Sequence, residues 1–266
     1  MCFGVDLKIP IDQALKRALE AHREGKIDDA EKLYKAILST YPMHADANHN
    51  LGVIQISKKK YHKAVGYFEK AVQENSSFDQ FWISLVEALL LIDRFDLAKE
   101  ALARASEFKI DTKKFRELGD RVLKRSQRND ESLSLAKVLI QRFQNGEFAE
   151  AERLARSFTT QYPKQHLGWT VLGGVMKGIG KLSDSLTYCE RAAEVEPTDP
   201  NVQSNLGTVL RELGKLGEAS KRFRLALELD PGEASRHADL ASSLEANGEL
   251  EEAREHYEHA LKISPD

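Results

Sequence analysis

The sequence contains little cysteine and no recognisable set of metal ligands. It has two cysteines, Cys2 and Cys189, in 266 residues. Cysteines this far apart form neither a metal-binding pair nor a disulfide framework, so a reducing compartment is the simpler inference. Among the eight histidines, His256 and His259 are three residues apart but have no apparent third ligand. We therefore expect no bound metal and no cofactor.

Long hydrophobic runs are also absent. The longest apolar-looking stretch, residues 81–92, spans 12 residues and contains Glu87, which makes it too short to cross a bilayer. The first six residues, Met1 to Asp6, lack the basic flank and the apolar segment of a signal peptide. The sequence therefore predicts a cytoplasmic protein that makes no membrane contact.

Neither sign of charge dominates the chain as a whole. The net charge is −3, but residues 182–266 carry −9 and the preceding residues carry +6. A general nucleic-acid binder needs a strongly basic face, and a weakly basic front with an acidic rear does not supply one. We therefore expect no nucleic-acid partner.

What the sequence does contain is a repeat of 34 residues. A glycine recurs at this spacing, at Gly146, Gly180, Gly214 and Gly248. A small residue follows five positions after each glycine, at Ala151, Ser185, Ala219 and Ala253. A proline follows 17 positions after each glycine, at Pro163, Pro197, Pro231 and Pro265. The frame extends to the front of the chain, so that repeats begin at Ile11, Ala45, Asp79, Ser132, His166, Pro200 and Ala234.

This spacing predicts a helical hairpin in each repeat. The segment that precedes each glycine is long enough for about four helical turns. The glycine ends the first helix, because a left-handed backbone costs glycine little. The small residue lets the two helices approach, and the proline ends the second helix. Neither helix can bury its apolar face alone, so the hairpins must stack into an all-α solenoid.

Apolar positions recur in register within the repeats. Position 24 is aromatic in four of them, at Tyr34, Phe68, Phe223 and Tyr257. Cys189 occupies this position in the fifth repeat, which predicts a buried small hydrophobe and not a reactive thiol. Trp82 and Trp169 both fall at position 4 and are predicted to be core residues.

The repeat resembles the tetratricopeptide repeat. The resemblance is carried by the Asn-Leu-Gly segments at Asn50–Gly52 and Asn205–Gly207, followed by the alanine, aromatic and proline positions, and it covers residues 11–112 and 132–266. The first repeat departs from the pattern at Arg17, and the third departs at Asp93 and Ile110. The resemblance implies a right-handed superhelical solenoid of seven repeats that binds other polypeptides.

A closer resemblance concerns three short segments, Asn48–Val53, Gln80–Ser84 and Gly168–Trp169. They resemble the repeat-rich N-terminal arms of bacterial multidomain proteins. Such arms precede glycosyltransferase domains of the O-GlcNAc transferase and SPINDLY-like type, or sulfotransferase domains. Neither kind of transferase domain is present in this chain, so the resemblance implies an arm and not an active site.

The repeat frame is broken once. The third and fourth repeats begin 53 residues apart, which leaves 19 extra residues from Lys113 to Glu131. Phe115, Leu118 and Val122 lie on one helical face, whereas residues 126–130 are polar and predict a turn. We expect one extra helix with a connector at 113–131, between an N-terminal segment with repeats 1–3 at 1–112 and repeats 4–7 at 132–266.

No catalytic set can be assembled from this sequence. The glycine-rich residues 173–181 fail as a phosphate-binding loop, because Val175 stands where a glycine is needed and Leu182 replaces the required Ser or Thr. Gly174 and Gly178 are instead expected to leave a shallow spot in the inner wall. We therefore predict that the chain is not an enzyme.

The remaining candidate surface is the inner wall of the solenoid. In tetratricopeptide repeats this wall is formed by positions 2, 5, 6, 9, 12 and 13 of each first helix. The candidate peptide-binding residues there are His49, Asn50, Lys137, Asn201, Ser204, Asn205, Thr208 and Arg211. Their polar groups can hydrogen-bond an extended peptide backbone. The alternative at each position is ordinary solvated helix surface.

Two functions follow from these observations. We expect a protein–protein interaction scaffold that binds a polypeptide along the concave face. The alternative is a substrate-recruiting arm of a bacterial protein glycosyltransferase or sulfotransferase whose catalytic domain is not in this chain. Because no capping element follows Pro265, the last helix would leave apolar surface bare. We expect further sequence to cover it, or self-association through this end.

Overall fold

The protein consists of consecutive α-helices joined by short loops. The computed structural model describes residues 9–265, and no strand occurs among them. The helices are α1 (Ile11–Arg23), α2 (Ile27–Thr40), α3 (Ala45–Ser57), α4 (Tyr61–Glu74), α5 (Asp79–Leu91), α6 (Phe95–Glu107), α7 (Lys113–Gln144), α8 (Phe148–Gln161), α9 (Leu167–Gly178), α10 (Leu182–Val195), α11 (Pro200–Glu212), α12 (Leu216–Leu229), α13 (Ala234–Ala246) and α14 (Leu250–Ile263). The predicted all-α fold is confirmed.

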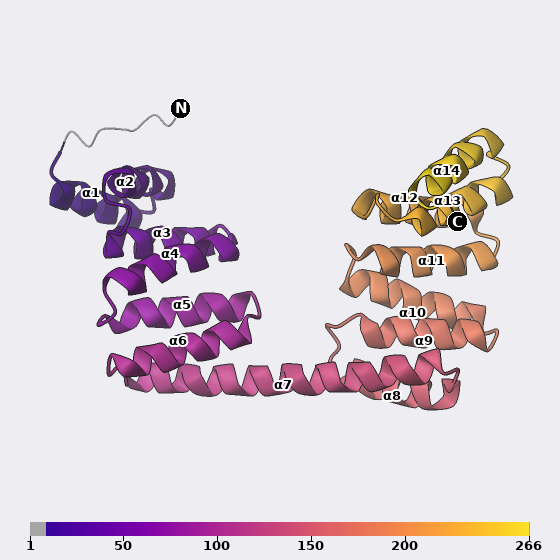
Figure 1. Ribbon diagram of the computed structural model, residues 1–266, viewed down its shortest axis with the longest axis horizontal. Coiled ribbons are helices and arrows are strands. Elements are labelled where there is room, and N and C mark those ends of the chain that lie inside the picture. The colour runs from indigo at the N-terminus through magenta and orange to yellow at the C-terminus, as the bar shows by residue number, and fades with distance from the viewer. Residues whose placement is uncertain (1–8, 266) are drawn as a thin grey trace. The chain divides into compact units, whose positions relative to one another are not determined.

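The helices form the seven predicted hairpins. Six of them are α1–α2, α3–α4, α5–α6, α9–α10, α11–α12 and α13–α14, each of which packs as a pair. The seventh consists of the C-terminal part of α7 and α8, since Leu139 of α7 shares one apolar core with Ala151 and Phe158 of α8. Figure 1 shows the helices of each unit following one another in chain order.

The turn inside each hairpin requires a left-handed backbone at one residue. Five glycines supply it, with φ between 74° and 84°, and they are Gly25, Gly146, Gly180, Gly214 and Gly248. In the second and third hairpins Lys59 and Asp93 adopt the same conformation, with φ of 57° and 55°. The repeat geometry therefore survives without glycine at these two positions, at a cost in local strain.

The chain divides into two compact units, residues 1–129 and 130–266. In the first unit Trp82 is fully buried, and its Nε1 donates a hydrogen bond to the carbonyl oxygen of Ser76 at 2.8 Å. Phe115, Leu118 and Val122 of α7 are buried in the same apolar core as Trp82, which confirms the predicted apolar face of this segment.

In the second unit the core is built from the repeated apolar positions. Leu172, Leu206, Phe223 and Leu240 are all at most 1% exposed. Trp169 differs from the prediction, because its side chain is only partly buried and stacks on the Tyr188 ring with centroids 6.3 Å apart.

The predicted turn at residues 126–130 is wrong. These residues lie inside α7, which continues without interruption from Lys113 to Gln144. The extra helix is therefore continuous with the first helix of the fourth repeat. The physical reason is that polarity alone does not end a helix, and no glycine or proline occurs between Gly119 and Gly146. The division at 112/113 and 131/132 stays a prediction; the two compact units divide within α7, after Asn129.

Candidate functional site

The second unit has a hollow in its inner wall with a volume of about 380 Å³. Helices α7, α9 and α11 supply most of its lining, and α10 supplies one residue. The lining residues are Ile140, Phe143, Leu167, Thr170, Val171, Gly173, Gly174, Lys177, Cys189, Asn205 and Val209. Most of them occupy the inner-wall positions of the repeat, so the hollow opens on the surface where the sequence predicted binding.

Two glycines shape the lining of the hollow. A Cβ atom on Gly174 would stand 2.6 Å from the Phe143 ring, and one on Gly173 would stand 2.6 Å from the Cys189 sulfur. Gly178 lies against the Phe148 ring instead, where a Cβ would stand 2.9 Å away. Both glycines therefore lie against an aromatic ring, and of the two only Gly174 lines the hollow.

Cys189 forms part of the apolar lining and is 3% exposed. Burial raises the pKa of its thiol to about 11, because the charged thiolate would be poorly solvated. A thiol with so high a pKa is a weak nucleophile near neutral pH. The prediction of a buried small hydrophobe at this position is confirmed.

The polar groups at the hollow come from two helices, α9 and α11. Asn205 of α11 is exposed, and its side chain makes no hydrogen bond with any residue that the structure describes. Thr170 donates a hydrogen bond to the carbonyl oxygen of His166 at 3.1 Å. Lys177 pairs with Glu212 at 3.6 Å, and both side chains are about 40% exposed. Asn205 is therefore the group that is free to bind a partner through its amide.

Two other predicted site residues are engaged by a buried arginine. Arg236 is 7% exposed, and its guanidinium donates to Asp230 Oδ2 at 2.9 and 3.1 Å. The same group donates to Asn201 Oδ1 at 3.2 Å and to Ser204 Oγ at 3.5 Å. Sequence reasoning missed this residue. Its signal was an arginine at position 3, where the preceding repeat has Val202.

The last two candidates of the sixth repeat also have partners within the protein. Thr208 donates to the carbonyl oxygen of Ser204 at 3.0 Å, one helical turn earlier. The Arg211 guanidinium lies over the Phe223 ring, 5.4 Å from its centroid. Burial raises the pKa of the neighbouring Asp239, although Arg211 and Arg236 act in the opposite direction. The Arg211 side chain therefore packs on Phe223 of the same repeat, in addition to lying on the inner wall.

The remaining candidates are His49 and Asn50 of α3 and Lys137 of α7. His49 Nε2 lies 2.9 Å from Ser84 Oγ, and its ring packs on Phe81 with centroids 4.9 Å apart. Burial lowers the pKa of His49. Asn50 donates to the carbonyl oxygen of Asp46 at 2.8 Å. Lys137, on α7 in the second unit, is exposed. None of these contacts tests whether the three residues bind a peptide, so their binding role stays a prediction.

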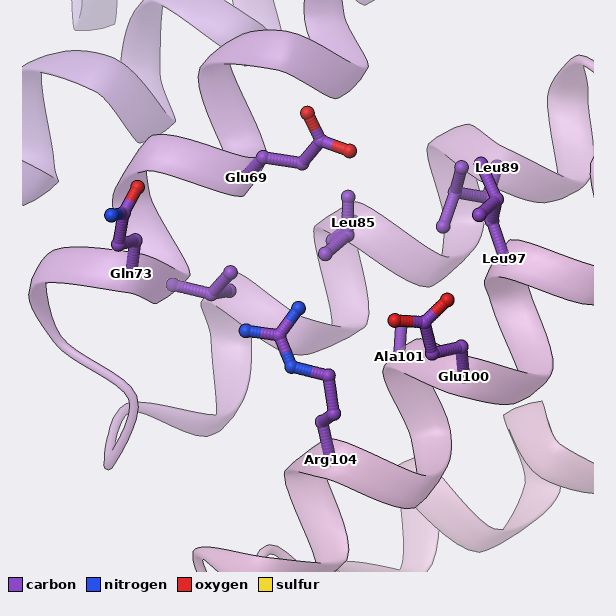
Figure 2. Close-up of a pocket in the computed structure, with 9 residues that line it drawn as sticks. Glu69, Gln73, Leu85, Leu89, Leu97, Glu100, Ala101 and Arg104 are labelled. Atoms are coloured by element: carbon purple, nitrogen blue, oxygen red, sulfur yellow. The ribbon is translucent and has the colours of Figure 1, made fainter.

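The first unit has a smaller groove on a different surface, with a volume of about 240 Å³ (Figure 2). It lies between α4 and α6, with Leu85 and Leu89 of α5 in its lining. Figure 2 shows the side chains of Glu69, Glu100 and Arg104 around it. These groups have both signs of charge and come from second helices of the hairpins. The groove therefore lies off the inner wall, whereas the hollow between α7, α9 and α11 is lined mostly by inner-wall positions and is the candidate binding site.

Comparisons with known proteins agree with this architecture. The family model described as tetratricopeptide repeat matches residues 15–80 and 204–266. The chain has the fold of the TPR domain of P58(IPK), with a TM-score of 0.57 and 14% sequence identity, over 96% of this chain and 74% of that one. The chain therefore has the fold of a tetratricopeptide repeat solenoid, and two stretches of it match the family model.

Two further solved structures are more distant in overall superposition. The Cut9–Hcn1 hetero-tetramer of the APC/C gives a TM-score of 0.47 at 18% identity, over 94% of this chain but only 46% of that chain. YrrB, described as a TPR protein with an unusual peptide-binding site, gives 0.37 at 17% identity, over 88% and 93%. No curated protein matches the sequence.

The described residues also bear on metal binding and membrane insertion. Among residues 9–265 no group of three or more His, Cys, Asp or Glu side chains is arranged to hold a metal ion. No helix in the same range is long and apolar enough to span a membrane.

Proposed function

We propose that the protein is an interaction scaffold that binds an extended polypeptide along the inner wall of its second unit. The observation that carries this proposal is Asn205, an exposed amide without an internal partner at the edge of an apolar hollow. An asparagine side chain can donate to a peptide carbonyl and accept from a peptide N–H. The neighbouring hollow offers apolar surface for a side chain of the same peptide.

The test begins with selection of binders from a displayed library of random linear peptides. We expect the selected peptides to bind Asn205→Ala about fivefold more weakly in fluorescence anisotropy, the effect of about 1 kcal/mol for one lost hydrogen bond. Asn145→Ala is the matched control, because Asn145 lies in a hairpin loop and bonds the exposed Glu147. Failure to select any peptide, or equal affinity for both variants, would overturn the proposal.

The alternative is a recruiting arm of a protein glycosyltransferase or sulfotransferase. It is supported by the resemblance of Asn48–Val53, Gln80–Ser84 and Gly168–Trp169 to such arms. An arm predicts that the reading frame continues past residue 266 into a transferase domain. It also predicts that peptides selected on the inner wall are modified when that domain is supplied, whereas a free-standing adaptor binds them without modifying them.

A further inference from the structure

The hollow in the second unit coincides with a change in the repeat pattern at Cys189. In the second repeat a Cβ atom on Gly52 would meet the Phe68 ring at 2.6 Å. In the sixth repeat one on Gly207 would meet the Phe223 ring at 2.9 Å. The position-24 ring therefore lies against the position-8 glycine in both repeats. In the fifth repeat the same glycine, Gly173, meets only the sulfur of Cys189.

The hollow therefore lies where four of the other repeats hold an aromatic ring. Cys189 is too small to fill the space of a Phe or Tyr side chain, and it lines the hollow together with Gly173. An apolar cavity of about 150 Å³ is large enough to hold benzene. The hollow, at about 380 Å³, accommodates a ring together with part of the chain that carries it.

The walls of the hollow suit an aromatic occupant. Gly173 and Gly174 contribute no side chains to the lining, and Gly173 corresponds to the glycines on which the Phe68 and Phe223 rings lie in the second and sixth repeats. The Phe143 ring stands beside Gly174 and offers a partner for ring–ring packing. Ile140, Val171 and Val209 add further apolar surface to the lining.

The charged residue at the hollow indicates which peptide group lies beside the aromatic ring. Lys177 is the charged residue in the lining, and its contact with Glu212 at 3.6 Å is solvent-exposed. An exposed ion pair of this kind contributes little, so it exchanges readily for another carboxylate. A carboxylate on a bound peptide would therefore find a cation at the hollow and an amide at Asn205.

We propose that the hollow is a recognition site for an aromatic side chain of an acidic, extended peptide, with a carboxylate beside the ring on Lys177. This inference rests on the proposed function and names the partner's chemistry. The partner's ring takes the place that the fifth repeat leaves unfilled. Among the three repeats with glycine at position 8, the second and sixth fill this place with Phe68 and Phe223, and only the fifth leaves it open.

The test uses the synthetic peptide acetyl-Gly-Asp-Phe-Asp-Gly-amide and the full chain. Binding is followed by two-dimensional NMR through the backbone amide shifts of Gly173 and Gly174. Replacing the peptide's Phe by Ala should weaken binding at least tenfold, and replacing both of its Asp residues by Asn should weaken it severalfold. Equal binding of the Phe and Ala peptides would overturn the inference without any change to the protein.

Protein variants then locate the ring. Cys189→Phe fills the hollow from within and should abolish binding of the Phe peptide, whereas Cys189→Ala leaves the hollow open and should preserve it. Undiminished binding to Cys189→Phe would show that the ring sits elsewhere. If library-selected peptides bind in an Asn205-dependent way but the Phe peptide does not bind, this inference fails and the proposed function stands. If neither binds, both fail.

Discussion

At the scale of single residues, Arg236 connects the sixth and seventh repeats. Its guanidinium contacts Asp230 in the preceding loop and reaches Asn201 and Ser204 of α11. Because the side chain is 7% exposed, its removal deletes packing as well as charge-assisted hydrogen bonds. The inner wall of the sixth repeat is therefore held in place by a residue of the seventh.

We expect Arg236→Ala to lower the free energy of unfolding by about 2 kcal/mol. Arg236→Met should lower it less, because the aliphatic volume is kept. Urea denaturation followed by circular dichroism measures both changes. The control is Arg254→Ala, which breaks an exposed pair with Glu251 at 3.2 Å and should change stability by less than about 0.5 kcal/mol. A similar loss for Arg236→Ala and Arg254→Ala would contradict a structural role for the buried network.

The residue scale also shows where prediction from sequence stops. Position in the repeat correctly predicted that Asn205 faces the inner wall and that Cys189 is buried. It could not predict that Asn201 and Ser204 are occupied by Arg236. Such contacts depend on side-chain directions between two hairpins, which a pattern of spacings does not contain.

At the scale of helices, the 34-residue period correctly predicted the positions of the hairpin turns, whereas the polarity of residues 126–130 led to a wrong prediction of a turn. The hairpin turns at Gly146, Gly180, Gly214 and Gly248 all lie where the spacing predicts them. Residues 126–130 are polar, yet they continue α7, because no glycine or proline interrupts the helix there. Ser126 at 3% and Ser132 at 2% exposure are buried at the two ends of this segment. The positions of helix-breaking residues therefore predicted where helices end, and the polarity of a segment did not.

Three histidines, His237, His256 and His259, lie close together on α13 and α14. The Nδ1 atoms of His237 and His256 lie 3.1 Å apart, and the His237 and His259 rings stack with centroids 5.4 Å apart. Burial, followed by the neighbouring imidazoles, lowers the pKa of His237. Burial also lowers the pKa of His256, against the opposing effect of Glu252. Arg224 of α12 and Glu255 are the other charged groups near His256.

We expect stability to fall as the pH drops below about 6.5, the ordinary pKa of histidine. Both histidines have a lower pKa in the folded protein, so the unfolded chain binds more protons in this range and gains stability relative to the fold. Thermal denaturation between about pH 7.5 and pH 5.5 measures the loss. His237→Gln should reduce the pH dependence, whereas His62→Gln, at a distant exposed position, should leave it unchanged. An unaltered pH profile in His237→Gln would contradict the role of the cluster.

At the scale of the whole molecule, each unit is a stack in which every hairpin buries the apolar face of its neighbour. The clearest information therefore came from comparing repeats with one another. That comparison identified the ring missing at Cys189, which the geometry of Gly173 then located in space. A single repeat read alone would not have shown that anything was missing.

The last described hairpin exposes apolar side chains, and we expect self-association through the surface around Leu261. Leu250, Leu261 and Ile263 are 63%, 60% and 45% exposed. Leu261 also lines a hollow of about 470 Å³ together with Tyr257 and Ala234. Apolar surface concentrated in this way favours contact with another molecule.

We expect the molar mass measured by light scattering to rise with concentration, and Leu261→Glu to abolish the rise. The substitution places a charge in the middle of this apolar face, where burial in a contact would leave it unpaired and poorly solvated. Lys262→Glu is the control, because it adds a carboxylate at the neighbouring exposed position without changing the apolar face. It should associate as the original chain does. If the original chain stays monomeric at high micromolar concentration, the apolar surface of α13 and α14 forms no such contact. If both variants lose association equally, net charge governs the association and this surface is not the contact.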